Sequence, residues 1–139
     1  CEVVRASNPN SAVEIPWYPE NHPERPLFLS CIFISLKPCT DGLITICRGL
    51  IGVDSTFLKV DFVGVLLSVV ALDGNNEMFP TAWGIVSGED EETWKFFLYH
   101  LKNVLQQGRD NNWCIILDRH KAYNDFWIEV GRRYRMKHL

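Results

Sequence analysis

The chain has 139 residues, 47% of them apolar, so it is long and apolar enough to form one domain with a buried core. Its 14 Lys and Arg against 17 Asp and Glu give a net charge of -3, which excludes nucleic-acid binding through bulk positive charge. The longest apolar stretch, residues 27–36, is shorter than the roughly 20 residues that a membrane span needs, so we expect no membrane association.

The cysteines indicate a reducing environment. They are Cys1, Cys31, Cys39, Cys47 and Cys114. Their number is odd and no pair has the C-x-x-C spacing, so neither a disulfide framework nor a zinc knuckle built from them is expected. We interpret them as reduced, mostly buried thiols of an intracellular protein.

The first third of the chain predicts little regular structure. Residues 1–26 are rich in Pro and Asn, which is typical of a loop with at most one short strand. Residues 27–48 carry two apolar groups interrupted by Pro38 and Gly42, and we expect two short helices there. Residues 1–48 are therefore predicted to be a loop and helical lead-in, followed by a core domain over residues 49–139.

The core domain begins with three predicted strands. Apolar runs cover residues 50–58, 62–72 and 78–86, and the second run is rich in β-branched residues, as in a buried strand. The turn formers at positions 73–76 predict a hairpin held by Asp73. Three strands joined by short turns imply an antiparallel meander.

A helix is predicted next. Residues 87–90 supply its cap, acidic residues 89–92 favour its N-terminus, and apolar residues recur at helical spacing up to position 105, before Gly108 as the terminator. A buried strand over residues 113–117, a helix over 122–130 and a strand from 134 complete the chain. The order β-β-β-α-β-α is that of a ribonuclease H-like mixed α/β sheet.

Two acids stand on otherwise apolar strands of this order. Asp54 lies in the first core strand and Asp118 ends the fourth. These two strands are expected to lie side by side at the centre of the sheet, where the carboxylates would meet and share a hard divalent cation. The alternative is that Asp54 starts a turn and Asp118 caps the following helix.

Five segments, in order, resemble the core of Mutator-like element (MULE) transposases and of the related far-red-impaired-response regulators of plants. They are residues 51–59 (IGVDSTFLK), 64–76 (GVLLSVVALDGNN), 79–86 (FPTAWGIV), 92–98 (ETWKFFL) and 115–121 (IILDRHK). The resemblance covers nearly the whole chain and implies a DDE transposase domain of ribonuclease H-like fold.

The resemblance also implies a site. The first two catalytic, metal-binding acids of the family map onto Asp54 and Asp118, and Mg²⁺ or Mn²⁺ would serve two-metal cleavage and transfer of DNA strands in the intact protein. The family's third acid, a Glu, lies after a helical insertion, beyond Leu139. The domain is therefore expected to be truncated before its last helix, and this N-terminal part to be inactive alone.

The sequence departs from the family at three positions. Ser55 and Val60 stand where the family has Gly, which suggests a relaxed copy. In the family's Cys-x-x-His element, Arg135 replaces the Cys and His138 remains, so we expect no zinc there.

Local basic residues could contact DNA even though the whole chain is acidic. The candidates are Lys59, Arg119, His120, Lys121, Arg132 and Arg133. They could equally be solvated surface. The resemblance implies DNA as partner through the parent protein, a homodimer or higher oligomer, and a nuclear location.

Two other functions can be compared with this pattern of residues. A domesticated, non-catalytic regulator of transcription associated with DNA would keep the same core and both acids. A phosphohydrolase with Asp54 as nucleophile needs a second Asp two residues later, and Thr56 stands there instead.

Overall fold

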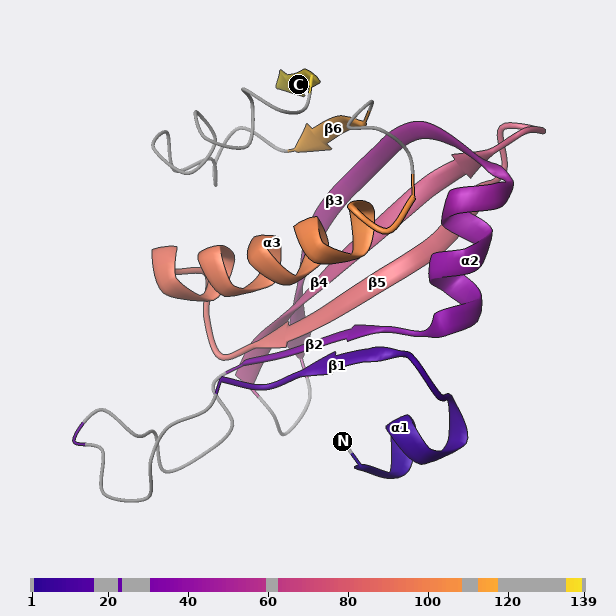
Figure 1. The fold of residues 1–139 in the computed structure, drawn as a ribbon. Coiled ribbons are helices and arrows are strands. Elements are labelled where there is room, and N and C mark those ends of the chain that lie inside the picture. The colour runs from indigo at the N-terminus through magenta and orange to yellow at the C-terminus, as the bar shows by residue number, and fades with distance from the viewer. Residues whose placement is uncertain are drawn as a thin grey trace.

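The computed structural model describes residues 2–16, 23, 31–59, 63–108 and 113–117, and residues 135–138 as backbone. Its helices are α1 (Glu2–Ser7), α2 (Lys37–Thr45) and α3 (Glu91–Leu105). Its strands are β1 (Ala12–Glu14), β2 (Cys31–Ser35), β3 (Cys47–Lys59), β4 (Val63–Asp73), β5 (Met78–Val86), β6 (Cys114–Leu117) and β7 (Arg135–His138). The expected mixed α/β class is confirmed (Figure 1).

One sheet unites all the described strands, in the order β1-β2-β5-β4-β3-β6-β7. The strands β3, β4 and β5 form the predicted antiparallel meander. The strand β6 then pairs parallel to β3 on its other side. The first and fourth core strands therefore lie side by side, as the sequence predicted.

The hairpin between β4 and β5 is held by Asp73, as predicted. Its Oδ1 accepts hydrogen bonds from the backbone N–H groups of Asn75 (2.8 Å) and Glu77 (2.9 Å). Asn76 has a φ of 65°, in the left-handed region that Asn tolerates better than most residues. This short-range bonding explains why the turn could be predicted from the sequence alone.

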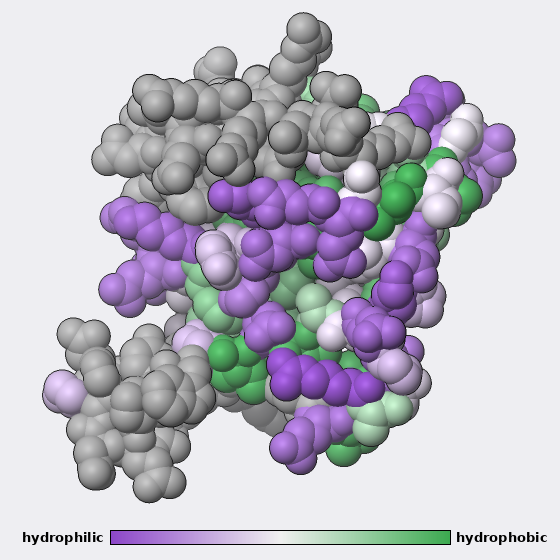
Figure 2. Space-filling model, in the orientation of Figure 1, coloured by the Kyte–Doolittle hydropathy of each residue, from purple (hydrophilic) through white to green (hydrophobic). Residues whose placement is uncertain are grey.

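Helix α3 begins with a capping box at Asp90. The Asp90 side chain accepts from the N–H of Thr93 (2.9 Å), and the Thr93 hydroxyl accepts from the N–H of Asp90 (3.3 Å). The helix buries one face against the sheet, while its outward surface is mostly hydrophilic (Figure 2). The predicted helix is therefore confirmed in position and in its apolar face.

Gly108 does not end α3 in the way that we expected. The helix is capped at Gln106, and none of the described glycines has a positive φ. A Cβ at Gly108 would lie 2.6 Å from Cγ1 of Ile44, in α2. The glycine is therefore explained by the close approach of the chain to α2, which lies beside the C-terminal end of α3 (Figure 1).

The N-terminal region is more regular than predicted. The prediction of two short helices over residues 27–48 is wrong for the first of them. Residues Cys31–Ser35 form the strand β2, in which buried and partly exposed side chains alternate. Helix α1 also lies where only a loop and a short strand were expected. The short strand itself exists as β1, and β1 and β2 extend the sheet beyond β5.

The second expected helix is α2, and the two residues that appeared to interrupt it belong to it. Pro38 stands in its first turn, where a missing N–H costs nothing. Gly42 faces β5, and a Cβ there would lie 2.4 Å from the ring of Phe79. Glycine thus permits close packing of α2 on the sheet.

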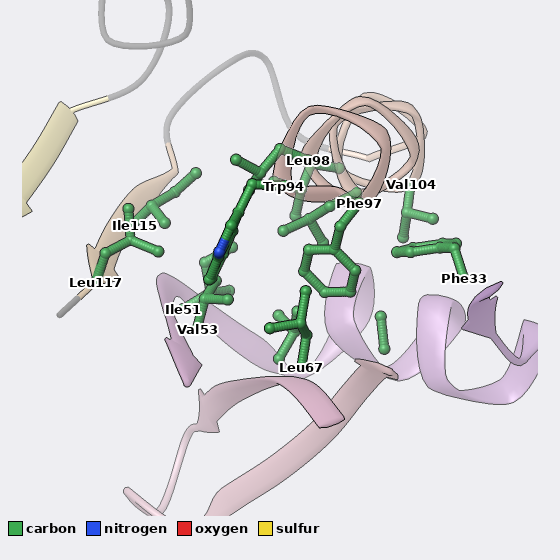
Figure 3. Packing of buried hydrophobic residues seen from close by; sticks show 14 of the residues in the cluster. Phe33, Ile51, Val53, Leu67, Trp94, Phe97, Leu98, Val104, Ile115 and Leu117 are labelled. Carbon is green, nitrogen blue, oxygen red and sulfur yellow. The ribbon is translucent and has the colours of Figure 1, made fainter. Parts of the chain in front are cut away.

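The main core lies between α3 and the sheet (Figure 3). It joins the labelled side chains Phe33, Ile51, Val53, Leu67, Trp94, Phe97, Leu98, Val104, Ile115 and Leu117. No disulfide joins the four cysteines in the part of the chain that is described. Across the same residues, no helix has the length and apolar character needed to cross a membrane.

Candidate functional site around Asp54

Asp54 lies in the middle of β3, on the face of the sheet away from α3. Its neighbour Val53 is buried among the side chains beneath α3 (Figure 3), and successive residues of a strand point to opposite faces. Asp54 is exposed. Because it stands inside a strand of 13 residues, the alternative that it starts a turn is wrong.

The Asp54 carboxylate has one described hydrogen bond. Its Oδ1 accepts from the backbone N–H of Ser55 at 2.8 Å. Within the described ranges, Asp54 forms no ion pair. One carboxylate oxygen is therefore held locally, and the other is open to a ligand or a neighbouring side chain.

The parallel pair of β3 and β6 brings the second predicted acid close in register. Val53 is the Cα partner of Leu117, and both side chains are buried. Asp54 follows Val53 in the sequence, and Asp118 follows Leu117. Asp118 itself lies outside the described residues, as do Arg119, His120, Lys121, Arg132 and Arg133.

Lys59 is not brought to Asp54. It is exposed at the end of β3, five residues after Asp54, which is about 17 Å along an extended strand. An odd number of steps also places the two residues on opposite faces of the sheet. A contact of Lys59 with DNA would therefore lie away from the Asp54 carboxylate.

His138 ends β7, and its Cα partner is Leu117 of β6. Only the backbone of β7 is described, so His138 as a remnant of the Cys-x-x-His element stays a prediction. Among the residues with described side chains, no group of three or more His, Cys, Asp or Glu is placed to hold a metal ion.

Two residues near Asp54 were missed by the sequence analysis. Ser68 of β4 is the Cα partner of Asp54, and Trp83 of β5 is the Cα partner of Ser68. The three positions form a row across the sheet on the face away from α3. Trp83 is half-buried on this face.

A signal for Ser68 was present in the sequence. It is the one polar residue in the run from position 65 to 72. What the sequence could not show is its partner, because the register between β3 and β4 decides which residue faces it.

The site thus consists of an exposed acid on β3, an interior strand of a mixed sheet. The parallel strand β6 beside it leads to a second acid in the sequence. The model of the MULE transposase domain family matches residues 50–130, more than half of the chain. The chain belongs to the MULE transposase domain family. No curated protein and no solved structure gives a significant match.

Proposed function

We propose that this chain forms part of a ribonuclease H-like DDE transposase catalytic domain, in which Asp54 and Asp118 hold Mg²⁺ or Mn²⁺ for DNA strand cleavage and transfer. The observation that carries the proposal is the register of Val53 with Leu117 in the parallel pair of β3 and β6. The family match, which spans both acids, supports a transposase-related role.

The register supports a meeting of the two acids. Neighbouring strands lie about 4.8 Å apart, so one further step of the same pairing would set Asp118 beside Asp54. Val53 and Leu117 are both buried on the α3 side. One step of alternation from each would direct both carboxylates to the opposite face.

The described chemistry of Asp54 fits a hard divalent cation. Its carboxylate is exposed, and of its two oxygens only Oδ1 accepts a described hydrogen bond. Two adjacent carboxylates would repel each other, and a cation with oxygen ligands relieves that repulsion. When bound, such ions supply an activated water and stabilise the leaving oxygen in phosphodiester cleavage.

The remaining parts of the proposal concern DNA. Arg119, His120 and Lys121 directly follow Asp118 in the sequence, where they would meet a phosphate near the acids. Lys59 is exposed and would contact DNA farther away. A third carboxylate from the intact protein, assembly as a dimer or higher oligomer, and a nuclear location complete the proposed transposase.

The alternative function is a DNA-associated regulator of transcription that no longer cleaves DNA. Ser55 favours it, because this residue stands beside Asp54 where the resembling family carries Gly. Such a regulator would keep the sheet and lose the need for a cation. Metal binding therefore separates the two functions.

The experiment follows thermal unfolding of the chain while Mn²⁺ is added. A cation at 100 times its Kd stabilises a folded protein by about 2.7 kcal/mol, which is roughly 10 °C in Tm for a domain of this size. We expect this rise for the wild type. Asp54→Asn and Asp118→Asn should each lose most of it.

Asp41→Asn is the matched control, since Asp41 is an exposed acid on α2 that pairs with Lys37. This variant should respond to Mn²⁺ like the wild type. Equal stabilisation of all four proteins would contradict the proposal that Asp54 and Asp118 share a cation. No stabilisation of the wild type would favour the non-catalytic regulator.

A further inference from the structure

Ser68 stands directly across from Asp54 in the sheet. The two residues are Cα partners in the antiparallel pair of β3 and β4, and the register is continuous from Ile51 to Lys59. Directly opposed residues have Cβ atoms about 4.5–5.5 Å apart on the same face. A serine hydroxyl and an aspartate carboxylate at that separation are within reach of one hydrogen bond.

Ser68 is the single polar residue of an apolar stretch of β4. It is half-buried in the middle of a strand whose residues from 65 to 72 are otherwise all apolar. No hydrogen bond of its hydroxyl is described, and Nε1 of Trp94 is the only buried side-chain polar atom without a partner among the described residues. The Ser68 hydroxyl is therefore accessible to solvent or to a neighbouring side chain.

Ser35 provides a contrast within the same sheet. It is also a strand serine, and its hydroxyl is fully buried. That hydroxyl bonds to the hydroxyl of Thr40 (3.1 Å) and donates to the backbone oxygen of Thr81 (3.0 Å). Ser35 is thus satisfied by contacts within the fold. Ser68, in contrast, makes no described hydrogen bond of this kind and lies opposite Asp54.

We propose that Ser68 is a positioning residue for Asp54: its hydroxyl donates to Oδ2 of the carboxylate, while the Ser55 N–H holds Oδ1. The inference deepens the proposed function and rests on it in one respect, namely that the Asp54 carboxylate binds a cation. A carboxylate offers about four lone-pair sites, so two donors leave about two for a cation. Held from both sides, the carboxylate keeps one rotamer and presents its remaining lone pairs outward.

The test compares the wild type with Ser68→Ala, Ser68→Thr and Ser87→Ala. Ser87 is an exposed serine just after β5, and its replacement is the matched control. The first measurement uses no metal: three-bond couplings to Cγ of Asp54, measured by NMR, report whether its χ1 angle is fixed or averaged. The second is the Kd for Mn²⁺.

We expect one fixed rotamer of Asp54 in the wild type, Ser68→Thr and Ser87→Ala, and an averaged rotamer in Ser68→Ala. The Kd for Mn²⁺ should rise roughly tenfold in Ser68→Ala, as for other losses of a partner that orients a ligand. Ser68→Thr should keep both the fixed rotamer of Asp54 and the wild-type Kd for Mn²⁺, because threonine retains the hydroxyl and suits a strand.

Unchanged couplings in Ser68→Ala would overturn the positioning role. This outcome is distinct from failure of the proposed function, which would appear as wild-type Mn²⁺ affinity in Asp54→Asn. In that case the couplings would still decide whether Ser68 orients Asp54. Amide spectra of each variant establish that the sheet remains folded.

Discussion

Val53 of β3 and Leu117 of β6 are Cα partners in a parallel pair, and both are almost fully buried beneath α3, with 5% and 4% of their surface exposed. Each is followed in the sequence by an aspartate. Burial of these two side chains on the α3 side of the sheet therefore fixes the register of β3 with β6 next to the proposed site.

Truncation of Leu117 tests whether its side chain lies on the α3 side of the sheet. Leu117→Ala should lower the free energy of unfolding by about 2–4 kcal/mol, because it opens a cavity in the buried cluster beneath α3. Chemical unfolding in urea measures the loss. Ile116→Ala is the control: Ile116 is the preceding residue and only half-buried, so its loss should be smaller. Equal losses would contradict the assignment of faces on β6.

Two glycines of the sheet should respond differently to alanine. A Cβ at Gly84 would lie 2.5 Å from Cδ2 of Phe97, so Gly84→Ala should destabilise the protein by about 1–3 kcal/mol through overpacking under α3. At Gly52, on the Asp54 face, a Cβ would meet only Cγ2 of Val70, at 3.7 Å. Gly52→Ala should therefore change stability by less than about 1 kcal/mol. Thermal unfolding measures both, and a large loss at Gly52 would show that the face away from α3 is packed more tightly than described.

His100 should make stability depend on pH. Its ring lies 4.6 Å from that of Phe96 and 5.7 Å from that of Phe33, measured between centroids, and burial lowers its pKa, partly offset by the Glu14 carboxylate. The folded state therefore binds a proton less readily than the unfolded state. Stability from this group is complete above the ordinary histidine pKa near 6.5 and falls as the pH is lowered through the window beneath it.

Urea midpoints measured between pH 8 and pH 5, a range of about 1.5 units on each side of that ordinary pKa, test this expectation. The wild type should lose more stability toward acid than His100→Gln, which cannot take up the proton. Parallel profiles for the two proteins would contradict it.

Several elements could be predicted from the sequence because their signals are local. The hairpin follows from Asp73 and the turn formers after it, whose hydrogen bonds span at most four residues. Helix α3 follows from the capping box at Asp90 and an apolar face of helical period. The strands β4 and β5 were predicted to within one residue at each end, because long β-branched runs bounded by a turn leave little choice.

Other elements could not be predicted, because their signals are short and tertiary contacts decide them. Residues 31–35 form a strand because they pair with β5, more than 45 residues later in the chain. A short apolar run carries too little periodicity to distinguish a strand from a helix. Gly42 and Gly108 were read as breaks or terminators, yet their role is to admit the side chains of Phe79 and Ile44.

The sequence by itself determined which residues could carry the chemistry, since Asp54 is an acid in an apolar strand and Asp118 ends another. Only the tertiary structure decided that Asp54 points away from α3, opposite to its buried neighbour Val53, and that Ser68 is its Cα partner in β4. The reason is physical: in a strand, facing alternates at every residue, so a shift of one position in register would turn Asp54 into the core and give it another neighbour. That register is fixed by pairing between distant strands, which no local pattern encodes.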